Sequence, residues 1–183
     1  MASLSDVPPV QTDEIATDMT TGRKSKTTVA FDYGAHKLAE GATIHLYGTP
    51  GQERFSFMWD ILTEGGSGLV LLLDNSRSHP FRDLIFFLGA FEAYIARSAL
   101  VVGVTHFESS SRPSLDDYQE ELARLGYGDV AVFAADPRCR EDVAGLIASL
   151  ISANASPASK SAAGDLRKSG AQGLGTSAAF SPI

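Results

Sequence analysis

The stretch LYGTPGQERF, residues 46–55, decides the fold of this chain. It continues an alternating run that begins at Thr43, in which apolar and polar side chains take turns. That pattern is typical of a strand with one buried face. A glycine and a Pro-Gly pair then end the strand and lead into a predicted helix. In open α/β sheets, ligands bind at the carboxyl ends of such strands. The stretch therefore predicts a ligand-binding turn.

Buried strands and an amphipathic helix follow this turn. Continuous apolar runs at residues 68–74 and 99–104 predict parallel strands that are covered on both faces. Between them, a helix opens at Pro80 and carries apolar residues at i, i+3, i+4 and i+7. Alternation of this kind predicts an α/β fold built from βαβ units with right-handed crossovers.

The alternation of helix and strand repeats once more before the composition of the chain changes. A helix follows Pro113, with Ser114 and Asp117 placed as a capping box. A strand is expected at residues 129–134 and a last helix at residues 141–151. The sheet of this α/β fold is thus predicted to be mostly parallel, with helices on both faces.

The two ends of the chain carry weaker signals. Residues 1–26 read as a long polar loop, and residues 27–34 and 42–47 predict two antiparallel strands. From residue 153 onward, Ala, Ser, Gly and Pro dominate, so residues 153–183 are expected to form a disordered tail outside a domain at 1–152.

The composition of the chain limits the classes of function that it can have. A chain of 183 residues with 44% hydrophobic content can fill the core of one domain. The net charge of −7 argues against a nucleic-acid partner. Cys139 is the single cysteine, which excludes an intrachain disulfide and fits a reducing compartment. The apolar runs of the chain are too short to span a membrane. We expect a cytoplasmic protein.

The turn also resembles a known family. Residues 48–55, GTPGQERF, resemble the switch II segment of Ras- and Rab-like small GTPases, whose pattern is Asp-x-x-Gly-Gln followed by Glu-Arg-Phe. The Gly-Thr-Pro-Gly-Gln variant is similar to bacterial MglA-like GTPases and their actinobacterial conservon relatives. Over residues 1–152, this resemblance implies a Ras-like P-loop NTPase fold and a GTP/GDP switch with Mg²⁺ and GTP hydrolysis.

The resemblance also implies roles for three residues near the γ-phosphate. Gln52 would orient the attacking water, and the Gly51 N–H would close on the phosphate. Thr28 lies four residues before Asp32, the spacing of the threonine that binds Mg²⁺ in Rab-type sequences. Without the resemblance, Thr28 reads as a β-branched residue that opens a strand.

The base-binding positions depart from the family. The segment from Thr105 through His106 to Glu108 stands where the Asn-Lys-x-Asp guanine motif is expected, and Ala135 matches the alanine of the Ser-Ala-Lys loop. Glu108 is expected to accept two hydrogen bonds from guanine. Guanine selectivity stays open, and so does the alternative that His106 is a loop histidine without a ligand.

The helix expected at residues 55–64 carries more apolar residues than one stripe can hold. Such a surplus either packs under a neighbouring loop or forms an exposed surface for a partner. By resemblance this helix faces effectors, so Phe57 and Trp59 are candidates for a partner surface. Regulatory or effector proteins, including Roadblock-type dimers, are the partners that the resemblance implies.

One expected motif is missing. The sequence contains no G-x-x-x-x-G-K-[ST], the loop that holds the β- and γ-phosphates in P-loop proteins. We expect that the first strand and this loop are absent, which would leave the strands at 42–47 and 68–74 with unpaired inner edges. Such a chain would bind GTP negligibly. The alternatives are a nucleotide-free pseudo-GTPase interaction module and another α/β fold, such as a flavodoxin-like regulator.

Overall fold

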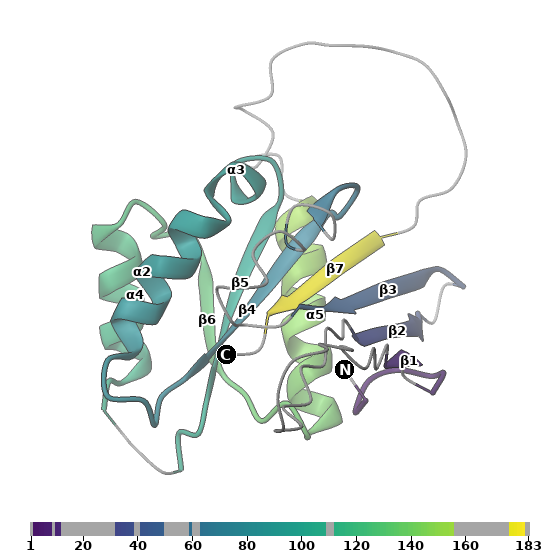
Figure 1. Ribbon diagram of the computed structural model, residues 1–183, viewed down its shortest axis with the longest axis horizontal. Coiled ribbons are helices and arrows are strands. Elements are labelled where there is room, and N and C mark those ends of the chain that lie inside the picture. The colour runs from purple at the N-terminus through teal and green to yellow at the C-terminus, as the bar shows by residue number, and fades with distance from the viewer. Residues whose placement is uncertain are drawn as a thin grey trace, which may run out of the picture.

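A computed structural model describes residues 2–8, 10–11, 32–38, 41–49, 59, 63–108, 112–155 and 176–181. These residues form an α/β fold, in which helices cover both faces of a mixed β-sheet (Figure 1). The strands are β1 (Val10–Gln11), β2 (Asp32–Lys37), β3 (Thr43–Gly48), β4 (Gly68–Asp74), β5 (Ala99–Thr105), β6 (Ala131–Ala134) and β7 (Thr176–Ser181). The helices are α2 (Pro80–Ala90), α3 (Glu92–Ile95), α4 (Leu115–Arg124) and α5 (Arg140–Ala155).

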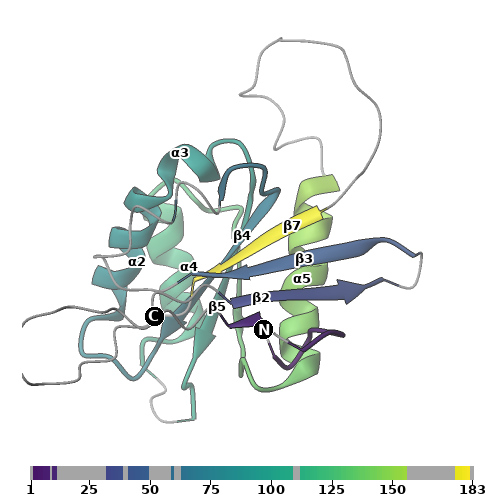
Figure 2. The same ribbon diagram turned by 45° about the vertical axis from the view of Figure 1, so that its right-hand side comes forward.

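The sheet combines an antiparallel part with a parallel part. Its strand order is β1-β2-β3-β7-β4-β5-β6. The strands β1, β2 and β3 pair antiparallel, whereas β4, β5 and β6 run parallel. Between the two parts lies β7, which is parallel to both β3 and β4 (Figures 1 and 2). The predicted α/β class with βαβ units is confirmed.

The core has two layers because β4 and β5 are apolar on both faces. Leu69, Leu71 and Leu73 of β4 pack on one face against α2 and α4. Val70 and Leu72 point to the other face, where α5 covers them. Every residue of β5 is buried. The continuous apolar runs therefore correspond to parallel strands covered on both sides, as predicted.

Local sequence signals set the helix starts. Pro80 stands at the beginning of α2. The capping box of α4 is confirmed, because Ser114 Oγ accepts from the Asp117 amide at 3.2 Å and the Asp117 carboxylate accepts from the Ser114 amide at 2.7 Å. No helix in the described part of the chain is long and apolar enough to cross a bilayer.

The C-terminal region differs from the predicted tail. Helix α5 continues to Ala155, and Thr176–Ser181 forms β7. Ala179 of β7 is paired with Tyr47 of β3 and with Leu69 of β4. The expectation that β3 and β4 have unpaired inner edges is therefore wrong. A strand needs only its main-chain groups to fill such a position, and a segment rich in Ala and Ser supplies them.

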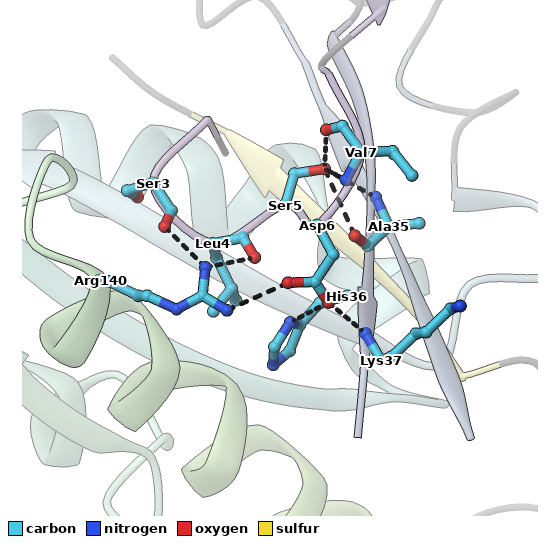
Figure 3. A network of polar contacts seen from close by, with 9 residues as sticks. All are labelled: Ser3, Leu4, Ser5, Asp6, Val7, Ala35, His36, Lys37 and Arg140. Carbon is cyan, nitrogen blue, oxygen red and sulfur yellow. Dashed lines mark hydrogen bonds and ion pairs between the residues drawn. The ribbon is translucent and has the colours of Figure 1, made fainter. Parts of the chain in front are cut away.

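The N-terminal segment is part of the fold and not only a polar loop. Leu4 is buried in the core cluster beneath α5. Asp6 joins β2 to α5 (Figure 3): its carboxylate accepts from the Lys37 amide at 2.7 Å and contacts His36 Nδ1 at 2.8 Å and Arg140 Nη2 at 3.1 Å. The Lys37 amide, followed by Arg140 and His36, lowers the pKa of Asp6 to about 2, although partial burial opposes this.

Trp59 does not form an exposed partner surface. Its side chain is 4% exposed and packs against Phe87 and Phe91, with ring centroids 5.6 and 5.0 Å away. The prediction of an exposed anchor is wrong at this position, and the packing alternative is confirmed. Phe57 lies outside the described residues.

Substitution Asp6→Asn should make stability less dependent on pH in the acid range. The pKa of Asp6 is lower in the folded protein than its ordinary 3.8, so its contribution is present above this value and is lost as the pH falls towards about 2. Melting temperatures measured between these pH values should converge for wild type and variant at the acid end. Asp129→Asn, at an exposed turn residue, is the control and should keep the wild-type profile. Parallel profiles for Asp6→Asn would contradict the prediction.

Substitution Ala179→Pro should destabilise the protein by about 1–3 kcal/mol, because proline removes a main-chain donor from a strand with neighbours on both sides. Urea unfolding measures the effect. Ala179→Ser keeps the donor and is the control. An unchanged unfolding midpoint for Ala179→Pro would show that β7 contributes nothing to stability.

Candidate functional site

Polar side chains gather where three parallel strands end. Asp74 closes β4, Thr105 closes β5 and is followed by His106, and Asp136 lies just beyond β6. Because β4, β5 and β6 are parallel neighbours, their carboxyl ends meet at one edge of the sheet. Ligands of open α/β sheets bind at this edge. It is therefore the candidate site.

Asp74 and His106 form a pair at the centre of this edge. Asp74 Oδ1 lies 3.1 Å from His106 Nδ1 and also accepts from the amide and the hydroxyl of Ser76. Partial burial alone would raise the pKa of Asp74, but the Ser76 hydrogen bonds and the charges of His106 and Arg77 outweigh burial and lower this pKa. Asp74 is thus an anion that holds one ring nitrogen of His106.

His106 has a backbone conformation that few side chains adopt. Its φ is +57°, in the left-handed region. Its side chain is 52% exposed, so the ring can contact a ligand while Asp74 holds Nδ1. Unusual backbone at an exposed ionisable residue is a recurrent feature of functional sites. Both predictions for His106, a ligand-binding residue and a loop histidine without a ligand, stay predictions.

The other predicted base-binding residues have different surroundings. Thr105 is buried, and its hydroxyl donates to the Leu73 carbonyl at 3.1 Å, so it holds β5 to β4. Ala135 is also buried, and its amide donates to the Val104 carbonyl. Glu108 is exposed. The edge thus brings His106, Thr105 and Ala135 together, with the Thr105 hydroxyl 3.1 Å from His106 Nδ1, and their ligand contacts stay predictions.

Several predicted residues cannot be placed. Thr28, Gly51 and Gln52 lie outside the described residues, so their predicted roles stay predictions. Asp136 was not singled out from the sequence, although its pKa is lowered to about 2 by the Arg138 side chain that it binds. Within the described ranges, no group of three or more His, Cys, Asp or Glu could hold a metal ion.

A buried asparagine connects the loops behind this edge. The Asn75 amide donates to the Thr105 carbonyl at 3.0 Å, and its side chain donates to the Pro113 carbonyl at 3.3 Å. Its Oδ1 accepts from the Tyr118 hydroxyl at 3.0 Å. Burial, followed by the charges of Asp74 and Asp83, raises the pKa of Tyr118, so the hydroxyl remains a donor. A single Asn after a strand gives no sequence signal for this role.

An open hollow of about 540 Å³ lies between the loop after β4 and the loop before α4. Sequence reasoning did not single it out, because its lining comes from two separate segments. The hollow is lined by Arg77, Ser78, His79, Pro80, Phe81, Arg82, Arg112 and Pro113.

This arrangement defines the class: an open-sheet α/β protein with a candidate ligand site at the carboxyl ends of its parallel strands. The family described as "Conserved hypothetical ATP binding protein" matches residues 8–127, about two thirds of the chain. The chain belongs to this family.

A relative of the chain is the uncharacterized protein MJ1339 of Methanocaldococcus jannaschii. It is 40% identical over 50 residues, which make up 27% of this chain and 32% of the relative. The matched part thus spans about a third of that relative's length.

The family match overturns the interpretation as a Ras-like or MglA-like small GTPase. The resemblance rested on a short turn, whereas the family matches residues 8–127. The GTP switch, its hydrolysis and the Roadblock-type partners were implied by that resemblance and lose their support with it.

Substitution Tyr118→Phe should lower the free energy of unfolding by about 1 kcal/mol, because it removes the hydrogen bond to Asn75 Oδ1. Denaturant unfolding measures this, and Tyr127→Phe, at a partly buried tyrosine packed against the same core cluster, is the control. Equal stability of the two variants would contradict the role assigned to Asn75.

Proposed function

We propose that the protein binds an adenine nucleotide at the carboxyl edge of β4, β5 and β6. Membership of the ATP-binding family supports the nucleotide. The observation that carries the proposal is the Asp74–His106 pair, which places an exposed, oriented imidazole at the end of β5. This edge is where open α/β sheets bind their ligands.

The pair favours adenine for a chemical reason. When His106 is in its neutral form, the ionised Asp74 accepts its Nδ1 proton, which leaves Nε2 as a hydrogen-bond acceptor. The 6-amino group of adenine donates, whereas guanine presents a carbonyl oxygen at the same position. His106 Nε2 would thus bind adenine and repel guanine. A site built on a hydrogen bond discriminates well against an analogue that cannot make it.

In this proposal, Mg²⁺ binds together with the nucleotide. The described residues hold no cluster of acidic and histidine ligands for a metal ion. Mg²⁺ commonly binds through substrate phosphates and a few protein oxygens, and keeps several waters. The phosphates would therefore carry the ion into the site. The proposal concerns binding, and no hydrolytic role is assigned to a described residue.

Calorimetric titration with Mg-ATP and Mg-GTP tests the function. Wild-type protein should bind Mg-ATP more tightly than Mg-GTP. His106→Asn should weaken Mg-ATP binding by about tenfold and reduce the preference for ATP, because it removes one hydrogen bond to the base. Asparagine tolerates the left-handed backbone at this position, so the loop should be retained.

Glu120→Gln, an exposed change on α4, is the matched control and should bind Mg-ATP like wild type. Absence of Mg-ATP binding to the wild-type protein would refute the proposed function. Unchanged ATP affinity and selectivity in His106→Asn would refute the role given to His106.

A further inference from the structure

Three guanidinium groups gather around the hollow of about 540 Å³ beside the candidate site. Arg77 and Arg82 come from the β4–α2 loop and the first turn of α2, and Arg112 comes from the segment before α4. The chain as a whole has a net charge of −7. The hollow thus gathers three cationic side chains of an acidic chain.

Two of these arginines already hold carboxylates. Arg77 Nε lies 3.0 Å from Asp83, and Arg112 Nη1 lies 3.4 Å from Asp117. The second contact is long, and Asp117 is also engaged with the Ser114 amide at 2.7 Å. The Arg112 side chain is 82% exposed. Its ion pair with Asp117 is exposed, and exposed ion pairs contribute little to stability.

Arg82 differs from the other two. Its side chain makes no hydrogen bond or ion pair with any residue in the described ranges 63–108 and 112–155. It also stands in the first turn of α2, where the helix dipole adds positive potential. Its charge is therefore available to an anion in the hollow.

The two walls of the hollow are held in register. Asn75 bonds to the Thr105 carbonyl and to the Pro113 carbonyl, which joins the loop after β4 to the segment that precedes α4. Phe81 lines the hollow and packs edge-on against Tyr118, with ring centroids 5.1 Å apart. The main chain that carries the arginines is thus held in place on both sides of the hollow.

The hollow also adjoins the Asp74–His106 pair. The Arg77 amide donates to the Asp74 carbonyl at 3.3 Å, so the turn that carries Asp74 leads directly into the lining of the hollow. A volume of about 540 Å³ is within the usual range of small-molecule pockets.

We propose that this hollow holds the phosphate groups of the bound nucleotide, with Arg82 and Arg112 as the principal phosphate ligands. The fork of an arginine matches a phosphate group with two parallel hydrogen bonds. The identity of the ligand as a nucleotide rests on the proposed function. The anion-binding property rests on the arginines alone.

Calorimetry with three probes separates these two claims. Mg-ATP, adenosine and inorganic tripolyphosphate are titrated into wild type, Arg82→Gln, Arg112→Gln and Arg124→Gln. The first two variants should each weaken Mg-ATP and tripolyphosphate binding by about tenfold, the effect of losing one charge-assisted bond. Adenosine binding should be unchanged in both.

Arg124→Gln is the matched control, because it removes one arginine charge at the opposite end of α4, where the residue pairs with Glu121. Melting temperatures of all variants establish that each is folded. Arg82→Lys keeps the charge without the fork and should recover part of the affinity.

The outcomes distinguish the two proposals. If Mg-ATP binds equally to wild type, Arg82→Gln and Arg112→Gln, the phosphate site is refuted and the proposed function stands. If tripolyphosphate binds through Arg82 but ATP shows no preference over GTP and no dependence on His106, the phosphate site is supported and the adenine site is refuted. Absence of binding by both anions refutes both.

Discussion

The parallel pairing of β4 with β7 on one side and β5 on the other is the constraint on which the rest of the structure depends. Because β4 lies inside the sheet, its side chains must be apolar on both faces, and helices must cover both faces. Polar residues can therefore occur only where the strand ends. The first such residue is Asp74, at the edge where β5 delivers His106.

The buried connections behind this edge explain why a small site can be ordered. Asn75 joins the loop after β4 to the segment before α4, and it accepts a buried hydrogen bond from Tyr118 of α4, where water does not compete. Thr105 contributes a similar bond to the Leu73 carbonyl. These residues contact no proposed ligand group, yet they position His106 on one side and the arginine-lined hollow on the other. Function at this edge thus depends on residues that serve the fold.

In the proposed function, different parts of the site would divide the work of recognition. The Asp74–His106 pair offers one oriented acceptor, which suits a base that must be distinguished from another. The hollow offers positive charge in a fork geometry, which suits phosphates and contributes affinity without selecting a base. An acidic protein can bind a polyanion only if its cations are concentrated in this way. Arg77, Arg82 and Arg112 are gathered around one hollow in a chain of net charge −7, although Asp83 and Asp117 pair with two of them.

Part of this protein followed from the sequence alone. The apolar runs of β4 and β5, the opening of α2 at Pro80 and the capping box of α4 are local signals, each decided by neighbours within a few residues. They predicted the α/β class and most strand and helix positions. The short turn at residues 46–55 led to a wrong prediction of the small GTPase family, because a resemblance confined to ten residues cannot specify a family.

Contacts between distant residues were decided only by the tertiary structure. The pairing of β7 with β3 and β4 involves main-chain groups, which every sequence possesses, so composition could not reveal it. The burial of Trp59 depends on α2 lying above it, and the Asp6 contact with Arg140 joins opposite ends of the domain. The hollow likewise exists only because the ends of β4 and β5 converge. Local sequence determines which elements form, whereas sites between elements arise from how these elements pack.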